Sequence, residues 1–229
     1  MTSPVRSKKP KTSGPPLAGA SNGARLPSVL KHFKQVDPRF HTATKAHHSS
    51  LPAQLATKST RDGLFARLVR TVISQQLGTA AARSIFLRVQ TACKGKLTLE
   101  SVARVRPAAL RAAGLSGAKI KTIKTISRAV RSGSLDLLSL KKIPEAEAAE
   151  KLMAIWGLGP WSVEMFLMFA LGRADVFSPG DLGLIRAMET IYSLPKNAPR
   201  EKLLKIAEKW APYRTYACLL LWRTRDPIK

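Results

Sequence analysis

Apolar residues recur at intervals of three and four along most of the chain, the spacing of a helix that buries one face. One such helix begins near Asp62 and carries on one side the apolar residues Leu64, Phe65, Leu68, Val69, Val72 and Ile73. Another presents to the interior Ile120, Ile123, Ile126 and Val130. No stretch alternates convincingly between apolar and polar residues, as a half-buried strand would. The pattern therefore predicts an all-α protein.

The same spacing predicts further helices over residues 28–36, 80–93, 107–113, 144–155, 160–171, 181–192, 200–210 and 212–223. Pro144 and Pro160 fall in first turns, where proline fits because its missing N–H would have no intrahelical partner. The chain shows no internal repeat, and the predicted fold is all-α, with short loops between many helices. At 229 residues with 45% hydrophobic content, the chain can bury one core or two lobes that share a cleft.

The first 25 residues differ from the rest of the chain. They are rich in Ser, Pro, Gly, Lys and Arg, contain no acid and show no apolar period, so we expect a disordered basic arm before a helical domain over 26–229. The run Lys8-Lys9-Pro10-Lys11 fits a nuclear address or a solvated tail that binds phosphate. We expect a nuclear protein in a eukaryotic host and a cytoplasmic one in a bacterium.

The formal net charge of +25 indicates a polyanionic partner, nucleic acid before an anionic membrane surface. The most apolar run, residues 163–171, is too short to cross a bilayer, which needs about 20 residues. Two cysteines are too few for a disulfide scaffold or an iron–sulfur cluster, and the four histidines have no metal-ligand spacing. We therefore expect no membrane partner and no catalytic metal.

Gly157-Leu158-Gly159 lies between two predicted helices. A dinucleotide fingerprint is excluded because a strand should precede it and a third glycine should stand where Ser162 is. The turn is then a plain connector or a phosphate site, since glycines admit close approach and the next helix start offers free N–H groups. Beyond it, Asp181 follows Pro179-Gly180, where an aspartate caps a helix or serves as a functional acid.

Five ordered motifs resemble the helix-hairpin-helix DNA glycosylases, in the short alkylpurine form of yeasts and bacteria. They are Ser74-Gln75-Gln76-Leu77, Ala113-Gly114-Leu115-Ser116, the stretch 157–165 (GLGPWSVEM), Gly180-Asp181-Leu182-Gly183, and Trp210-Ala211-Pro212-Tyr213-Arg214 with Leu221-Trp222-Arg223. The resemblance covers about residues 26–225. It implies two helical lobes flanking a cleft, a hairpin at about 144–171, and excision of alkylated purines such as 3-methyladenine and 7-methylguanine from duplex DNA by a monomer that needs no cofactor.

The resemblance also implies roles for single residues. Asp181 would stabilise the positive charge that develops on the deoxyribose and orient the attacking water. Trp161 stands where lyase members carry an amine nucleophile, which favours a monofunctional enzyme. Trp161 and Trp222 would attract a cationic base by stacking and cation–π contact. Met165 replaces a tyrosine of longer relatives, so stacking there would be weaker.

Further implied roles concern DNA. Gln76 and Leu77 are candidates for the wedge that fills the gap left by an extruded base, and Leu77 is favoured of the two. The sequence by itself indicates a core leucine at Leu77, and the resemblance leaves wedge and core equally open. Gly157, Leu158 and Gly159 would contact a phosphate, with a structural cation possible at the hairpin carbonyls. The helix predicted over 160–171 is apolar on nearly every side, so we interpret Met165, Phe166, Met168 and Phe169 as core residues. Trp156 and Trp210 are interpreted as core tryptophans as well.

Three other functions compete with this interpretation. A noncatalytic helix-hairpin-helix DNA-binding protein would keep the hairpin without the reaction. A bifunctional glycosylase/lyase would need an amine nucleophile, and Trp161 disfavours it. A basic RNA-binding protein fits the charge but does not require the pocket tryptophans or Asp181.

Overall fold

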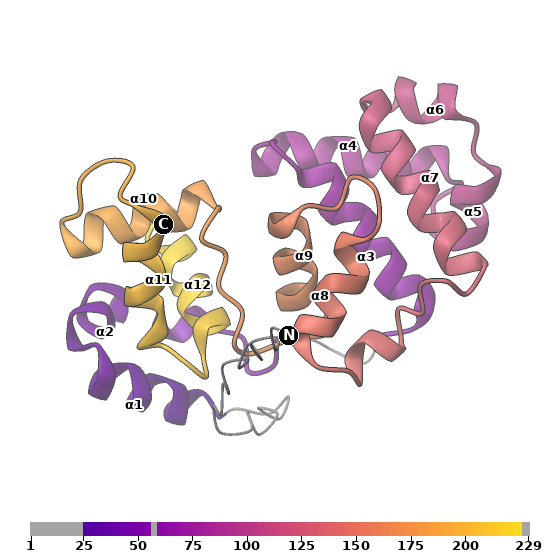
Figure 1. Cartoon of the computed structure of the whole chain (residues 1–229). Helices are drawn as coiled ribbons and strands as arrows, with labels where there is room; N and C mark the ends of the chain where they lie inside the picture. The colour runs from indigo at the N-terminus through magenta and orange to yellow at the C-terminus, as the bar shows by residue number, and fades with distance from the viewer. Residues whose placement is uncertain (1–24, 56–58, 226–229) are drawn as a thin grey trace, which may run out of the picture.

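The computed structural model describes residues 25–55 and 59–225, and helices dominate these segments (Figure 1). Within them no β-strand occurs, so the prediction of an all-α protein is confirmed. The predicted basic arm lies outside the described residues except for Arg25. None of the described helices combines the length and apolar content needed to cross a membrane.

The helices fall into three successive segments of the chain. The first segment holds α1 (Leu26–Val36), α2 (Pro38–Thr44) and the 3-10 helix η1 (Lys45–Ser50). The central segment holds α3 (Arg61–Ser74), α4 (Thr79–Ala92), α5 (Leu99–Arg104), α6 (Pro107–Ala112), α7 (Gly117–Arg131), η2 (Ser139–Lys141), α8 (Glu145–Met153), α9 (Pro160–Phe166) and the π-helical turn η3 (Leu167–Leu171). The last segment holds α10 (Leu182–Tyr192), α11 (Arg200–Glu208) and α12 (Arg214–Arg223).

These helices form two lobes (Figure 1). One lobe is continuous in sequence and runs from α3 to η3, with α3 packed against α4, α7 and α9. The other joins the two ends of the described chain, because α2 packs against α10 and η1 packs against α12. The predicted architecture of two lobes is confirmed, and the chain crosses between them after η1 and again after η3.

The apolar pattern identifies the core correctly. All six apolar residues predicted to share one face of the helix near Asp62 have no exposed surface, and α3 is the central helix of its lobe. The four predicted interior positions of α7 are buried as well. Periodicity identified these faces because only the buried side of each helix must stay apolar.

The helix predicted over 160–171 changes form part-way. It is α-helical to Phe166, widens into the π turn, and ends at Gly172, whose φ of 72° is the left-handed conformation that glycine adopts readily. Phe169 lies in the wide turn and is 42% exposed, so the prediction that it belongs to the core is wrong. π turns are rare and often occur at functional sites.

Two other assignments of tryptophan have opposite outcomes. Trp210 is fully buried, as predicted. Trp156 is 47% exposed, which contradicts its assignment to the core, and the Lys121 ammonium lies 4.0 Å from its ring centroid. Apolar character alone could not distinguish the two, since an exposed indole can pair with a cation instead of packing.

Candidate active site

A cleft separates the two lobes and contains two adjoining pockets. The larger, about 950 Å³, is lined by the loop after α3, the start of α7, the hairpin and the loop before α10; its lining includes Gln76, Leu77, Lys119, Gly159, Trp161 and Asp181. The smaller, about 580 Å³, is lined in part by Leu77, Trp161, Met165, Phe169, Asp181 and Trp222. Side chains predicted from distant parts of the sequence thus meet in one cleft. Leu158 is 5% exposed and lines neither pocket.

Asp181 lies where the two pockets join. It is the N-cap of α10, and its Oδ1 accepts from the Leu184 backbone N–H at 3.0 Å, so the predicted capping role is confirmed. The indole of Trp222 also donates to Oδ1, at 2.9 Å, and the indole of Trp161 donates to Oδ2 at 2.8 Å. Three N–H groups therefore fix both oxygens of a half-buried carboxylate.

Both tryptophans do more than provide aromatic surface. Their N–H edges point at Asp181, so the carboxylate sets the orientation of each ring in the pocket. The Phe169 ring adds a third aromatic wall, with its centroid 5.7 Å from that of Trp222. Met165 is almost fully buried and also lines this pocket. Sequence reasoning missed Phe169 because no residue pattern marks a π turn.

The backbone next to Asp181 leaves little space for a side chain at position 183. A Cβ on Gly183 would lie 3.0 Å from Asp181 Oδ1 and 3.1 Å from Trp222 Cδ1. These separations are tighter than ordinary van der Waals contacts, and any shift would disturb the indole–carboxylate hydrogen bond. A side chain at 183 would therefore crowd the Asp181–Trp222 pair, which glycine avoids.

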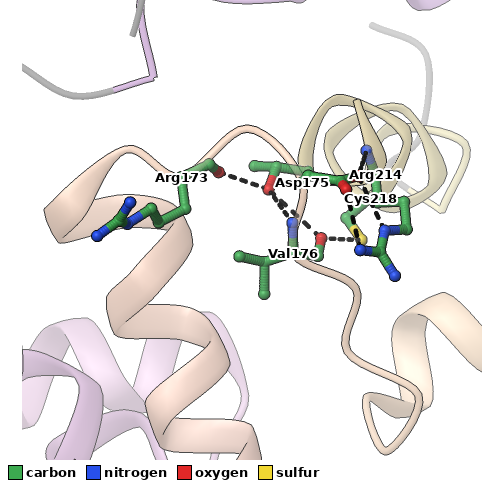
Figure 2. A network of polar contacts seen from close by, with 6 residues as sticks. Arg173, Asp175, Val176, Arg214 and Cys218 are labelled. Atoms are coloured by element: carbon green, nitrogen blue, oxygen red, sulfur yellow. Dashed lines mark hydrogen bonds and ion pairs between the residues drawn. The ribbon is translucent and has the colours of Figure 1, made fainter. Parts of the chain in front are cut away.

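The segment that leads to Asp181 is fastened to the start of α12 (Figure 2). Asp175 accepts from the Arg214 guanidinium at 2.8 and 2.9 Å, a bidentate pair. Thr215 Oγ1 donates to the Arg173 carbonyl at 2.7 Å and accepts from the Val176 backbone N–H at 3.0 Å. These bonds place the Asp181 loop against the helix that carries Trp222.

A second support comes from α9. The Ser178 hydroxyl donates to the Glu164 carboxylate, and Ser178 has no exposed surface. Burial raises the pKa of Glu164, while the hydrogen bond from Ser178 opposes that rise. The loop carrying Asp181 is thus tied to both lobes, to α9 through Ser178 and to α12 through Asp175.

The loop after α3 projects Leu77 into the cleft. Leu77 is 38% exposed, which agrees with a wedge and not with a core leucine, and Gln76 has a φ of 55°. Gln75 holds this loop to the hairpin, since its Nε2 donates to the Gly157 carbonyl at 3.0 Å and to Ser162 Oγ at 2.8 Å. Sequence reasoning gave Gln75 no role of its own.

Lys119 fastens the same loop from α7. Its Nζ donates to the carbonyls of Ile73 and Gln75, at 2.8 and 2.9 Å. These carbonyls stand at the end of α3, where backbone acceptors lack intrahelical partners and a cation is favourable. Burial lowers the pKa of Lys119. The sequence predicted only that Lys119 lies on the solvent-facing side of its helix. Its carbonyl partners could not be predicted, because they depend on how α3 and α7 pack.

The two hairpin glycines serve different purposes. Gly157 has a φ of 86°, and a Cβ there would collide with the Thr122 side chain of α7. Gly159 precedes α9, has an ordinary φ of −93°, and has no heavy atom near the position of a Cβ. Gly157 therefore satisfies internal packing, whereas Gly159 leaves a bare backbone facing the cleft. Within the described part of the chain, no group of three His, Cys, Asp or Glu side chains could hold a metal ion.

Comparison with known proteins points to one family. Residues 69–212 match the model of the HhH-GPD superfamily base excision DNA repair proteins. The chain is 36% identical over 163 residues to DNA-3-methyladenine glycosylase 1 of Schizosaccharomyces pombe, across 70% of this chain and 72% of that protein.

Solved structures agree. The crystal structure of a DNA-3-methyladenine glycosidase from Bacillus halodurans superposes with a TM-score of 0.72 at 37% identity, covering 87% of this chain and 89% of that one. The 3-methyladenine DNA glycosylase of S. pombe in complex with abasic DNA gives a TM-score of 0.75 at 30% identity, covering 86% and 95%.

Proposed function

This chain belongs to the HhH-GPD superfamily of base excision DNA repair proteins, and we propose that its interlobe cleft is the active site of a DNA-3-methyladenine glycosylase. The enzyme hydrolyses the N-glycosidic bond of alkylated purines such as 3-methyladenine and 7-methylguanine. The observation that carries this function is the Asp181 carboxylate, held by Trp161 and Trp222 where the two pockets join.

The chemistry follows from that arrangement. A flipped purine stacks against the indole rings, which brings its sugar next to Asp181. As the bond to the base breaks, C1′ gains positive charge, and the fixed carboxylate stabilises it without having to reorganise. Water supplies the new oxygen on C1′ and loses its proton, and the cationic purine leaves as a neutral base. No cofactor is required for this hydrolysis.

The reaction ends at an abasic site without cutting the strand. A lyase needs a free amine to form a Schiff base, and the hairpin position of that amine holds Trp161. The cleft does contain the amine of Lys119, but this amine donates hydrogen bonds to the carbonyls of Ile73 and Gln75. This engagement disfavours a bifunctional glycosylase/lyase.

Duplex DNA with alkylated bases is the substrate, and the cleft offers it two contacts. Leu77, with Gln76 beside it, enters the space that the flipped base leaves. The hairpin of Gly157, Leu158 and Gly159 would bind a phosphate, and of its three residues only Gly159, just before α9, lines the cleft. A structural cation at the hairpin would draw on nearby carbonyls, of which that of Gly157 already accepts from Gln75.

The test is release of free purines from methylated duplex DNA, with the strand examined for breaks before and after alkali. We expect methylpurine release by the wild type and breaks only after alkali. Breaks without alkali that disappear in Lys119→Gln would establish a lyase instead. DNA binding without any release would leave a noncatalytic binding protein and contradict the proposal.

A further inference from the structure

Arginines line the smaller, aromatic pocket but not the larger one. Those in the smaller pocket are Arg70, Arg83, Arg223 and Arg225, and the one acid there is Asp181. The larger pocket, which includes Gly159 of the hairpin, contains a single cationic side chain, Lys119. Positive charge in the cleft therefore gathers beside the aromatic walls, away from the hairpin that would bind the backbone of DNA.

We call the four arginines of the smaller pocket its arginine rim. Two of them come from the central lobe, Arg70 from α3 and Arg83 from α4. The Arg70 guanidinium lies 5.5 Å from the ring centroid of Phe86, and Phe86 follows Arg83 by three residues on the same face of α4. Both arginines are exposed, and among the described residues no carboxylate pairs with either. Clustered like charges repel one another unless an anion neutralises them.

The aromatic walls and the arginine rim have opposite effects on the binding of a cationic methylated purine. Trp161, Phe169 and Trp222 attract a cationic ring, whereas the guanidinium groups repel it. A purine whose added alkyl group ends in a carboxylate would satisfy both: its ring would stack while its carboxylate met the arginines. Arginine suits that contact because its planar fork binds a carboxylate in bidentate fashion.

We propose that this pocket takes alkylated purines bearing a terminal carboxylate, such as N-carboxymethylpurines, with the carboxylate against Arg70 and Arg83. The inference rests on the proposed glycosylase function and uses the same reaction. The N-glycosidic bond breaks, the oxygen of water bonds to C1′, and the purine leaves with its carboxylate attached. No oxidant, reductant or further reactant takes part.

The experiment compares release of carboxymethylpurines and methylpurines from duplex DNA treated with a carboxymethylating or a methylating agent. Released bases are measured by mass spectrometry under single-turnover conditions, with spontaneous loss subtracted. The quantity of interest is the ratio of the two rates, because contacts to the DNA backbone affect both rates alike. The test variant is Arg70→Gln/Arg83→Gln. The matched control, Arg111→Gln/Arg131→Gln, removes the same charge from exposed positions of α6 and α7 that line neither pocket.

We expect the carboxymethyl-to-methyl ratio to fall at least about threefold in the test variant and to stay unchanged in the control. In the wild type the ratio should also fall as salt rises from 0.1 to 1 M, because the screening length shortens from about 10 to about 3 Å. Equal losses for both adducts in the test variant would assign these arginines to DNA phosphates and overturn the inference. Absence of methylpurine release by the wild type would instead overturn the proposed function itself.

Discussion

Two aspartates in this chain make nearly the same hydrogen bonds in different surroundings. Asp181 caps α10 and accepts from two indoles, and Asp37 caps α2 while accepting from the Tyr192 hydroxyl at 2.6 Å and the Trp210 indole at 3.3 Å. Asp37 is 5% exposed inside one lobe, whereas Asp181 is half-buried and lines both pockets of the cleft.

The difference shows that hydrogen bonding alone does not identify a functional acid. At Asp37 every acceptor site faces the protein, so the carboxylate joins α2 to α10 and to the segment before α12. At Asp181 the same kinds of donors leave one side of the carboxylate open to a ligand. We therefore expect Asp37 to control stability and Asp181 to control activity.

Replacing Asp37 should produce the largest loss of stability. Asp37→Ala removes the cap of α2 and leaves the Tyr192 hydroxyl and the Trp210 indole without their acceptor, so unfolding free energy should fall by about 3–5 kcal/mol. Chemical denaturation measures this. Asp136→Ala is the matched control, since Asp136 is exposed and its carboxylate accepts from the Leu138 backbone N–H; a similar loss there would contradict the distinction.

The two hairpin glycines allow the same comparison between a residue required by internal packing, Gly157, and a residue whose backbone faces the cleft, Gly159. Gly157→Ala should cost about 2–4 kcal/mol, because alanine disfavours the positive φ and its Cβ collides with Thr122. Gly159→Ala should leave unfolding unchanged within about 0.5 kcal/mol and weaken DNA binding. Equal stability losses in the two variants would show that Gly159 is also required by packing.

Removing an indole donor should affect the cleft without unfolding the protein. Trp222→Phe keeps an aromatic ring but loses the hydrogen bond to Asp181 Oδ1, so we expect methylpurine release to slow about tenfold. The control is Trp156→Phe, because the Trp156 ring is exposed outside both pockets. A Trp222→Phe enzyme as fast as the wild type would mean that the indole contributes only stacking.

Tyr192 should report on the buried aspartate through pH. Burial and the acceptor Asp37 raise the pKa of Tyr192 above its ordinary value near 10. Above pH 10 the unfolded chain loses this proton while the folded chain keeps it, so stability should fall by about 1.4 kcal/mol per pH unit.

Tyr192→Phe should lower stability at neutral pH by about 1 kcal/mol, the contribution of one hydrogen bond. It should also remove that extra alkaline loss. Denaturation of both proteins between pH 8 and 11 measures the difference. Parallel curves for the two proteins would show that the hydroxyl is not held by Asp37 in solution.

Much of the fold was readable from helical periodicity. The long amphipathic helices α3 and α7 were predicted because each keeps one apolar face over three or more turns. Two short helices, α2 and α5, were missed, whereas α6, which is no longer than α5, was predicted. At six or seven residues an apolar period spans no more than about two turns and does not separate a helix from a loop. The packing of α2 and η1 against α10 and α12, which joins the two ends of the described chain in one lobe, had no local signal in the sequence.

The site was predicted in its residues but not in its contacts. Asp181, Trp161 and Trp222 were singled out by resemblance, and the structure places them in hydrogen-bonding contact. Gln75 and Lys119 act through backbone carbonyls of other elements, which depend on tertiary packing and leave no trace in sequence. The catalytic and binding roles of the predicted site residues stay predictions.

The most direct test of this account is Asp181→Asn, with methylpurine release under single-turnover conditions and unfolding free energy measured on the same protein. The Asn oxygen can still cap α10 and accept from the Trp222 indole, but the Asn amide nitrogen cannot accept from the Trp161 indole, and the side chain supplies no negative charge beside C1′. We predict a rate at least about a hundredfold lower, with a stability loss of no more than about 2 kcal/mol, the cost of the one indole donor left without an acceptor. Undiminished release by a folded Asp181→Asn protein would contradict the central claim.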